Sequence, residues 1–218
     1  MTLGQLNQTV EIPRITEIRD LGVQITSDFK PSIQCRNAAK KARRALYLLT
    51  RTVASRDPNV LIPLYKSLVR PHLEYCVQAW APSLQKDKII LESVQKAFTR
   101  TFPYLRELEY PKRLEHLNLF SLSRRRLRGD LIETFKFVKH INNTGEHLFS
   151  PHKNVALRGH SLKLEKKHSS TSIRANFFTN RVINAWNILP NEAVVAKTVD
   201  VFKYQIDRCW LLLLSDLE

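Results

Sequence analysis

The sequence predicts a mostly helical protein that begins with a short two-stranded hairpin. Only five glycines occur in 218 residues, and apolar residues recur at helical spacing through most of the chain. The hydrophobic share of 43% and the charged share of 25% are typical of a folded chain, which at this length buries one sizeable core or two small ones. Residues 5–27 differ, because their weak apolar alternation around Pro13 predicts two short strands.

The net charge of +15 indicates an anionic partner. Such an excess attracts polyanions, so nucleic acid or an anionic membrane surface is the natural partner class. A solvated basic surface without a partner is the alternative.

The three cysteines are far apart and include no C-x-x-C pair, which predicts reduced core residues of an intracellular protein, nuclear or cytoplasmic. The N-terminus lacks the apolar segment of a signal peptide, and the apolar run at 210–214 is too short to span a bilayer. We therefore expect no membrane partner.

A long helix is predicted from about Pro31 to Val53, with charge separated from apolar residues. One side carries Cys35, Ala38, Ala39, Ala42, Ala45, Leu46, Leu49 and Val53. The opposite side carries Arg36, Lys40, Arg43, Arg44 and Arg51. No acid occurs between Asp28 and Asp57, whereas a solvated helix face usually alternates in charge sign. The pattern favours contact with phosphates.

Two further helices complete a predicted bundle. Asp57 is a helix N-cap followed by proline at the first helical position, and Pro71 is expected to kink or end that helix. Its predicted buried face is Leu61, Leu64, Tyr65 and Leu68, and its continuation carries Leu73, Tyr75, Cys76 and Trp80. A third helix is predicted from about 86 to 101, with Ile90, Val94, Ala97 and Phe98 inward.

After a short helix at 111–117, a helix capped by Ser121 is predicted to run to about Ile141. It begins with a cluster of arginines, Arg124, Arg125, Arg126 and Arg128. Asp130 and Glu133 lie within helical reach of Arg126, which favours a solvated face. Arg124 and Arg128 stack one turn apart without an acid, so nucleic-acid contact stays an equal alternative.

Residues 142–173 are predicted to be the least structured part of the chain. In the segment HSLKLEKKHSSTS, at 160–172, only Glu165 opposes Lys163, Lys166 and Lys167, so this basic loop is either a flexible linker or an arm that tracks a nucleic-acid strand. Helices are expected again from about Arg174 to Leu189 and from Val199 to Leu214. The first has Phe177, Val182, Ala185 and Trp186 as core candidates.

Catalytic and metal-binding motifs are missing from the sequence. It contains no Asp-Asp or Asp-x-Asp pair of the kind that holds divalent ions for phosphoryl transfer, and no P-loop, G-x-S-x-G or Rossmann glycine pattern. The histidines lack Cys or carboxylate partners at ligand spacing. From its own residues the chain is predicted to be no enzyme and to hold no catalytic residue, metal or cofactor.

Several segments resemble the C-terminal part of LINE-type (non-LTR) retrotransposon reverse transcriptases, with a jockey-like character. In chain order they read RDLGVQITSDFK, NAAKKARRALYLLTR, SRDPNVLIPLYKSLVRPHLEYCVQAWAP, RRRLRGDLIETFKFVK, RGHSLKL and FFTNRVINAWNILP. The resemblance covers about Ile15 to Asp207.

The resemblance implies a role for each region. Residues 1–28 would be a remnant of the palm, with Leu21, Gly22 and Val23 as the primer-grip hairpin, where glycine lets the backbone turn close to a primer strand. Residues 29–105 would be the thumb, a helical bundle that holds the template–primer duplex. Residues 106–218 would be the post-thumb region, with nucleic-acid binding as its expected role.

The family's fingers and catalytic palm, with the Mg²⁺ site of the parent RNA-directed DNA polymerase, are expected upstream of Met1, so this chain alone is predicted to be inactive. We expect a fragment that binds RNA or an RNA–DNA hybrid through phosphates. The predicted contacts are Arg36, Lys40, Arg43, Arg44, Arg51, Arg124, Arg128, Lys163, Lys166 and Lys167. The alternatives are a helical scaffold that binds the missing palm half or a second copy, a non-functional relic, and a complete enzyme.

Overall fold

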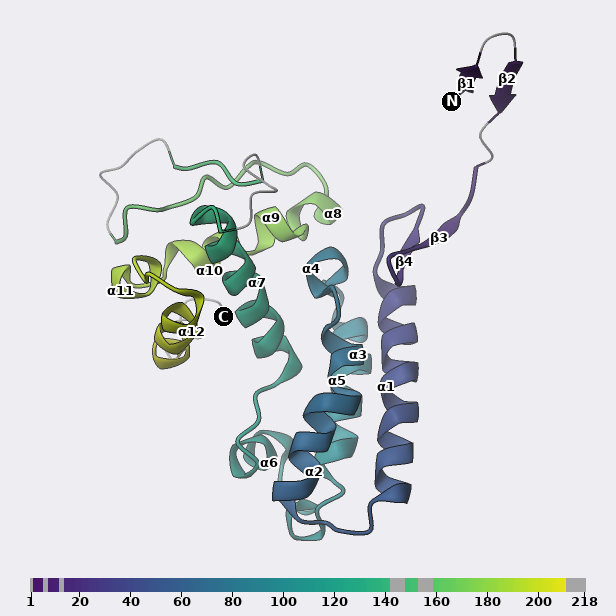
Figure 1. Cartoon of the computed structure of the whole chain (residues 1–218), viewed down its shortest axis with the longest axis vertical. Coiled ribbons are helices and arrows are strands. Elements are labelled where there is room, and N and C mark those ends of the chain that lie inside the picture. The colour runs from purple at the N-terminus through teal and green to yellow at the C-terminus, as the bar shows by residue number, and fades with distance from the viewer. Residues whose placement is uncertain (1, 6–7, 12–13, 142–147, 153–158, 211–218) are drawn as a thin grey trace.

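Two groups of helices, joined by one shared helix, make up most of the protein (Figure 1). The computed structural model describes residues 2–5, 8–11, 14–141, 148–152 and 159–210. Within them the chain is mostly helical and begins with short antiparallel strands, which confirms the predicted fold class. The predicted turn at 142–145 and the apolar end at 211–214 lie outside the described residues.

The N-terminal strands form hairpins. These are β1 (Thr2–Gln5) with β2 (Gln8–Glu11), and β3 (Glu17–Asp20) with β4 (Val23–Thr26). Leu21 and Gly22 make the turn of the second hairpin, with φ of 43° and 86°. Glycine populates positive φ readily, which explains the Leu-Gly sequence at this turn. Val23 then enters the first core, and the backbone N–H of Gln24 donates to Gln34 Oε1 at 2.9 Å, which ties the hairpin to the next helix.

The first group of helices follows. It consists of α1 (Ser32–Thr52), α2 (Pro58–Leu64), the π-helical turn η1 (Tyr65–Val69), α3 (Pro71–Glu74), α4 (Val77–Trp80) and α5 (Gln85–Thr99). The Asp57 side chain caps α2 by accepting from Asn59 N at 2.9 Å, as the sequence predicts. In the core between these helices the rings of Tyr65 and Phe98 stack with centroids 4.0 Å apart.

Pro71 changes the register of the second helix without ending it outright. Proline has no N–H to donate, and just before it the N–H of Arg70 bonds to Tyr65 O at 3.0 Å, five residues back. This wider turn adds one residue, so Val69 is fully buried and Leu68 is 51% exposed. The predicted burial of Leu68 is therefore wrong.

Three more apolar predictions in this group are also wrong. Tyr75 and Cys76 are exposed, because the helix ends at Glu74 and Cys76 takes a left-handed conformation with φ of 52°. On α5, Ala97 is exposed beside fully buried Phe98. Tyr75 packs instead against the β3–β4 turn, where its hydroxyl donates to Leu21 O at 2.9 Å.

The second group is built on a longer helix and several short ones. After η2 (Pro103–Leu105) and α6 (Tyr110–His116) come α7 (Leu122–Val138), α8 (Ser172–Ala175), α9 (Phe178–Arg181), α10 (Ile183–Asn187), α11 (Asn191–Val194) and α12 (Val199–Arg208). Its core includes fully buried Trp186 and the stacked rings of Phe135 and Phe202, with centroids 4.3 Å apart.

The single helix predicted from Arg174 to Leu189 is three short helices, α8 to α10. At the interruptions, asparagine side chains donate hydrogen bonds to backbone carbonyls: Asn176 Nδ2 donates to Ser172 O, and Asn180 Nδ2 donates to Arg174 O. Phe177 is consequently 45% exposed, against the prediction, and Phe178 takes the buried position.

The two cores share α7. The first core cluster extends through Leu122 at the start of α7, and the second begins at Leu131 in the same helix. The cores thus divide within α7. The boundary at 105 between the thumb and post-thumb regions stays a prediction. No helix among the described residues is both long and apolar enough to cross a membrane.

Candidate nucleic-acid interface

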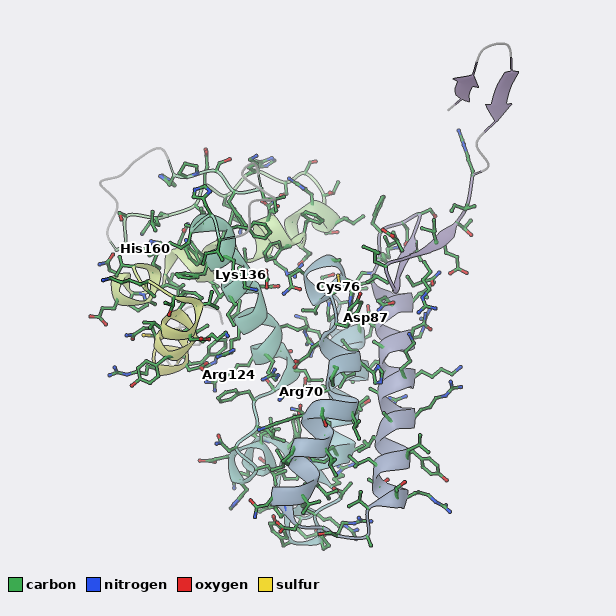
Figure 2. The ribbon with its side chains drawn as sticks, in the orientation of Figure 1. Arg70, Cys76, Asp87, Arg124, Lys136 and His160 are labelled. Carbon is green, nitrogen blue, oxygen red and sulfur yellow. The ribbon has the colours of Figure 1, made fainter. Side chains whose placement is uncertain are left out.

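The outer face of α1 carries the five basic residues that the sequence places there. Arg36, Lys40, Arg43, Arg44 and Arg51 are all exposed. On the opposite face Cys35, Ala38 and Ala42 are at most 3% exposed, since α1 packs there against α3 and α5. Figure 2 shows nitrogen-tipped side chains on the side of α1 that faces away from the other helices. The 3.6-residue period alone therefore separates the cations from the core.

No carboxylate compensates this face. The ion pairs formed by the described residues include none of the side chains of α1. Asp87 of α5 lies beside α1 but is 1% exposed, and its carboxylate accepts from Ser32 Oγ at 2.6 Å. Arg43 donates to the neutral hydroxyl of Ser93 at 2.7 Å. The face thus keeps its positive charge, as expected from the absence of acids between Asp28 and Asp57.

An open groove of about 720 Å³ runs along this face, between α1 and α5. Its α1 side is lined by Arg36, Lys40, Arg43, Arg44, Tyr47 and Leu48, and its α5 side by Ile90. Tyr47 is 58% exposed and Leu48 is 62% exposed, although both are large and apolar. The groove therefore combines cations with an exposed apolar floor.

The arginine cluster at the start of α7 behaves differently, because its members bind other parts of the chain. Arg125 Nη2 donates to Glu74 Oε2 at 2.9 Å and its Nε donates to Oε1, which raises the pKa of Arg125. Arg126 is 6% exposed and donates to Ser123 Oγ at 2.9 Å, and burial lowers its pKa. Neither side chain is available to a nucleic acid.

Arg124 and Arg128, predicted as contact residues, are both engaged with the C-terminal helix or its end. The guanidinium of Arg124 lies 3.7 Å from the ring centroid of Phe120 and 4.5 Å from that of Trp210, and burial lowers its pKa. Arg128 donates to both carboxylate oxygens of Asp207, at 2.7 and 2.8 Å. The prediction that Arg128 has no acid nearby is wrong, because its partner lies 79 residues away in sequence.

The acids expected to neutralise Arg126 also have other partners. Asp130 binds Arg181, with its Oδ2 2.8 Å from Nε, and Glu133 binds Lys136 within the same helix. Burial raises the pKa of Asp130, while the bond and charge of Arg181 oppose this rise. Arg181 also donates to the carbonyl of Gln78, at the end of the first group, so one guanidinium links α4, α7 and α9.

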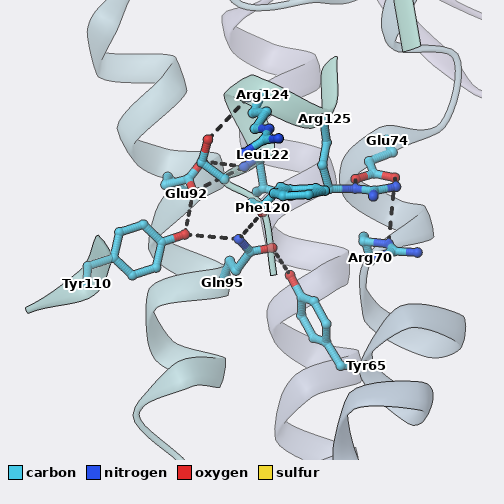
Figure 3. Close-up of polar contacts among 11 residues, drawn as sticks. Tyr65, Arg70, Glu74, Glu92, Gln95, Tyr110, Phe120, Leu122, Arg124 and Arg125 are labelled. Carbon is cyan, nitrogen blue, oxygen red and sulfur yellow. Dashed lines mark hydrogen bonds and ion pairs between the residues drawn. The ribbon is translucent and has the colours of Figure 1, made fainter. Parts of the chain in front are cut away.

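A polar network seats the start of α7 on the first group of helices (Figure 3). Gln95 is 1% exposed; its Oε1 accepts from Tyr65 Oη at 2.9 Å and its Nε2 donates to Phe120 O at 2.9 Å. Glu92 accepts from Tyr110 Oη and from the backbone N–H of Leu122. Burial, then the charge of Glu92, raises the pKa of Tyr110. This network is structural and faces away from the groove on α1.

The basic loop is partly fixed to the second group. Asn187 of α10 accepts from Leu164 N and donates to Leu164 O, both at 2.9 Å, and Leu164 is buried. Lys163 is therefore partly buried beside this anchor, and Lys166 Nζ donates to Asn184 Oδ1 at 3.2 Å. Lys167 is exposed. The loop is thus anchored at its centre.

The predicted primer-grip residues lie at the tip of the β3–β4 hairpin. Leu21 is 83% exposed, while Val23 is buried. A Cβ at Gly22 would lie 3.6 Å from the Tyr75 ring. Tyr75 therefore packs against the backbone of the turn, and the Leu21 side chain is exposed to solvent.

Metal-ligand clusters are not found in the described part of the chain: no three His, Cys, Asp or Glu side chains come together to hold an ion. Of the histidines, His160 is 2% exposed, and this burial lowers its pKa, while the contact of its Nε2 with Trp186 O, 3.0 Å long, opposes the fall. It completes the second core.

Comparison with protein-family models, with curated proteins and with solved structures finds no match to this chain. The residues themselves therefore carry the functional argument.

Sequence reasoning missed the apolar floor of the groove. A helical wheel carries the signal, because Leu48 is four residues after Arg44, and Tyr47 is seven residues after Lys40. Both side chains therefore share the cationic side of α1. The contribution of Ile90 had no sequence signal, since it depends on how α5 packs against α1.

Proposed function

We propose that this chain binds RNA or an RNA–DNA hybrid through phosphate groups, as the thumb-like part of a LINE-type reverse transcriptase. The observation that carries the proposal is the outer face of α1, whose five exposed cations form no ion pair with any residue that the structure describes. Cations spaced along one face of a single helix suit a polyanion, whose charges are also regularly spaced. The resemblance of the sequence segments to the non-LTR family supplies the type of nucleic acid.

The secondary contact zone of the proposal is narrower than the sequence suggests. A phosphate at Arg128 would compete with Asp207, and Arg124 is held between two aromatic rings. Lys167 is exposed, and Lys166 is exposed although it bonds Asn184. We therefore assign the main affinity to α1 and a minor share to the basic loop.

Salt dependence tests the proposal. Affinity for a labelled RNA–DNA hybrid, measured by fluorescence anisotropy across several salt concentrations, should fall by about 0.9 log units per log unit of salt for each phosphate neutralised. The double variant Lys40→Glu/Arg44→Glu should bind at least about tenfold more weakly, with a smaller salt slope and equal loss on unrelated sequences.

A matched control changes the net charge by the same amount elsewhere. Lys112→Glu/Lys197→Glu alters two exposed lysines of α6 and the α11–α12 connection, away from α1. We expect most of the wild-type affinity to remain. Equal loss in both double variants would attribute binding to net charge alone, and salt-insensitive or absent binding by the wild type would refute the proposal.

A protein partner is the second candidate, favoured by one observation. The β3–β4 hairpin and the residues beside it expose large apolar side chains: Ile15 at 57%, Ile18 at 51%, Leu21 at 83% and Phe29 at 70%. Exposed apolar groups of this kind mark association surfaces. Size-exclusion chromatography separates the candidates, because a monomer with strong salt-dependent RNA binding favours the first.

A further inference from the structure

The groove on α1 has a feature that phosphate binding does not use. A duplex presents its phosphates outward and keeps its bases stacked, so it would meet the cations of the rim and leave the floor empty. That floor consists of Tyr47, Leu48 and Ile90. Tyr47 and Leu48 are both more than half exposed, so they offer apolar surface to a ligand.

We propose that the groove between α1 and α5 binds an unpaired base of single-stranded RNA or DNA. Tyr47, Leu48 and Ile90 contact the base, while Arg36, Lys40 and Arg44 bind the phosphates beside it. The inference rests on the proposed nucleic-acid binding and names the form of nucleic acid that the α1 face prefers.

The cations of the rim are arranged along a line. Arg36, Lys40 and Arg44 are four residues apart, so they repeat about every 6 Å along one side of the helix. Arg43 is held across the groove by its bond to Ser93 on α5, 2.7 Å long. A strand that follows α1 thus meets successive positive charges while its bases face the floor.

The floor suits a flat aromatic group. Bases commonly stack on aromatic rings, and the Tyr47 ring is 58% exposed, with the Arg51 guanidinium 5.7 Å from its centroid. Leu48 and Ile90 add apolar surface beside it. The groove volume of about 720 Å³ lies within the usual range of small-ligand sites.

An amphipathic peptide helix fits less well. Such a helix inserts its own apolar anchors, at i, i+3 or i+4, and i+7, and therefore needs an apolar groove about two helical turns long to receive them. On α1 the exposed apolar positions are the neighbours Tyr47 and Leu48, and the next turns on either side carry Arg44 and Arg51. The apolar floor is therefore short, and the cations extend beyond it.

The test measures the affinities of wild type and variants for three nucleic-acid probes. The probes are a labelled oligothymidylate, the same strand with abasic sites in place of every base, and an RNA–DNA hybrid. Wild type should bind the oligothymidylate about five- to tenfold more tightly than the abasic strand. Tyr47→Ala and Leu48→Ser should each remove most of this difference, while leaving affinity for the abasic strand and the hybrid unchanged.

The chain offers a closely matched control. Tyr204 on α12 is 60% exposed, and Arg208 lies 5.7 Å from its ring centroid, so the pair repeats the Tyr47–Arg51 arrangement outside the groove. Tyr204→Ala should leave all three affinities unchanged. Tyr47→Phe keeps the ring and should retain preference for the base. Equal thermal unfolding temperatures for the variants exclude loss of folding.

The outcomes separate this inference from the proposed function. Salt-dependent binding of the hybrid, with no preference for bases and no effect of Tyr47→Ala, overturns the inference and leaves the proposed function standing. No salt-dependent binding of any probe overturns both. Displacement of the oligothymidylate by an amphipathic acidic peptide at lower concentration than by unlabelled strand would assign the groove to a protein partner instead.

Discussion

The outer face of α1 and the first turns of α7 are both rich in cations, but among the described residues only cations of α7 form ion pairs. Along α1 the basic side chains are exposed and form no ion pair with the described part of the chain. On α7, Arg125 binds Glu74 and Arg128 binds Asp207. The difference arises from position: α1 lies at the edge of the molecule, whereas α7 lies between two groups of helices that bring carboxylates to it (Figure 1). A cluster of arginines thus indicates a binding surface only where the neighbouring elements supply no acid.

The largest expected effect on the free energy of unfolding comes from removing the carboxylate of Glu74 on α3. Glu74 lies between Arg125 and Arg70, and all three side chains are about four-fifths buried. Glu74→Gln leaves two guanidinium groups close together without a carboxylate, so the free energy of unfolding should fall by about 2–3 kcal/mol. Urea denaturation measures it.

Arg44→Ala on α1 is the matched comparison, because it also removes one charge. It should change the free energy of unfolding by less than about 0.5 kcal/mol, as for most surface substitutions. Similar losses in Glu74→Gln and Arg44→Ala would show that the two regions do not differ in pairing.

A smaller effect is expected from unpairing Arg128. Asp207 is 37% exposed, so Asp207→Asn should lower the free energy of unfolding by only about 0.5–1 kcal/mol. The same change converts Arg128 into an unpaired cation like those of α1. Affinity for an RNA–DNA hybrid should therefore rise and its salt slope should steepen, measured by anisotropy. Asp200→Asn, which unpairs Lys203 on the same helix, is the control for net charge.

The smallest expected effect is a difference in thiol labelling, which tests whether the inner face of α1 is buried. Cys35 is fully buried on the inner face, and burial raises the pKa of its thiol to about 12. Cys76 is exposed. A thiol reagent at about pH 8 should therefore label Cys76 rapidly and Cys35 only after denaturation. Rapid labelling of Cys35 in the folded protein would place the inner face of α1 in solvent and remove the basis for the comparison.

The sequence predicts the parts of the fold that depend on neighbouring residues. The apolar period of α1 assigns Ala38 and Ala42 to the core and Arg36 to solvent, and Asp57 followed by proline marks the start of α2. These features need no knowledge of the rest of the chain, since helix periodicity and capping act within a few residues.

Features that depend on distant residues could not be predicted. Asp207 is 79 residues from Arg128, and nothing near either residue indicates the pair. The added residue in η1 is a local effect of Pro71, but the sequence indicates only a kink or an end there and not that burial moves from Leu68 to Val69. The groove likewise forms only when Ile90 is packed beside Leu48.

The sharing of α7 by two cores has a mechanical consequence. Leu122 belongs to one core and Leu131 to the other, nine residues along a single rigid helix. Arg181 adds a second link between the same bodies. Because each core includes a side chain of this one helix, a tilt of α7 moves both bodies together. If a nucleic-acid strand binds α1 as proposed, a tilt of α7 would therefore couple that binding to α12, on the opposite side of the molecule (Figure 1).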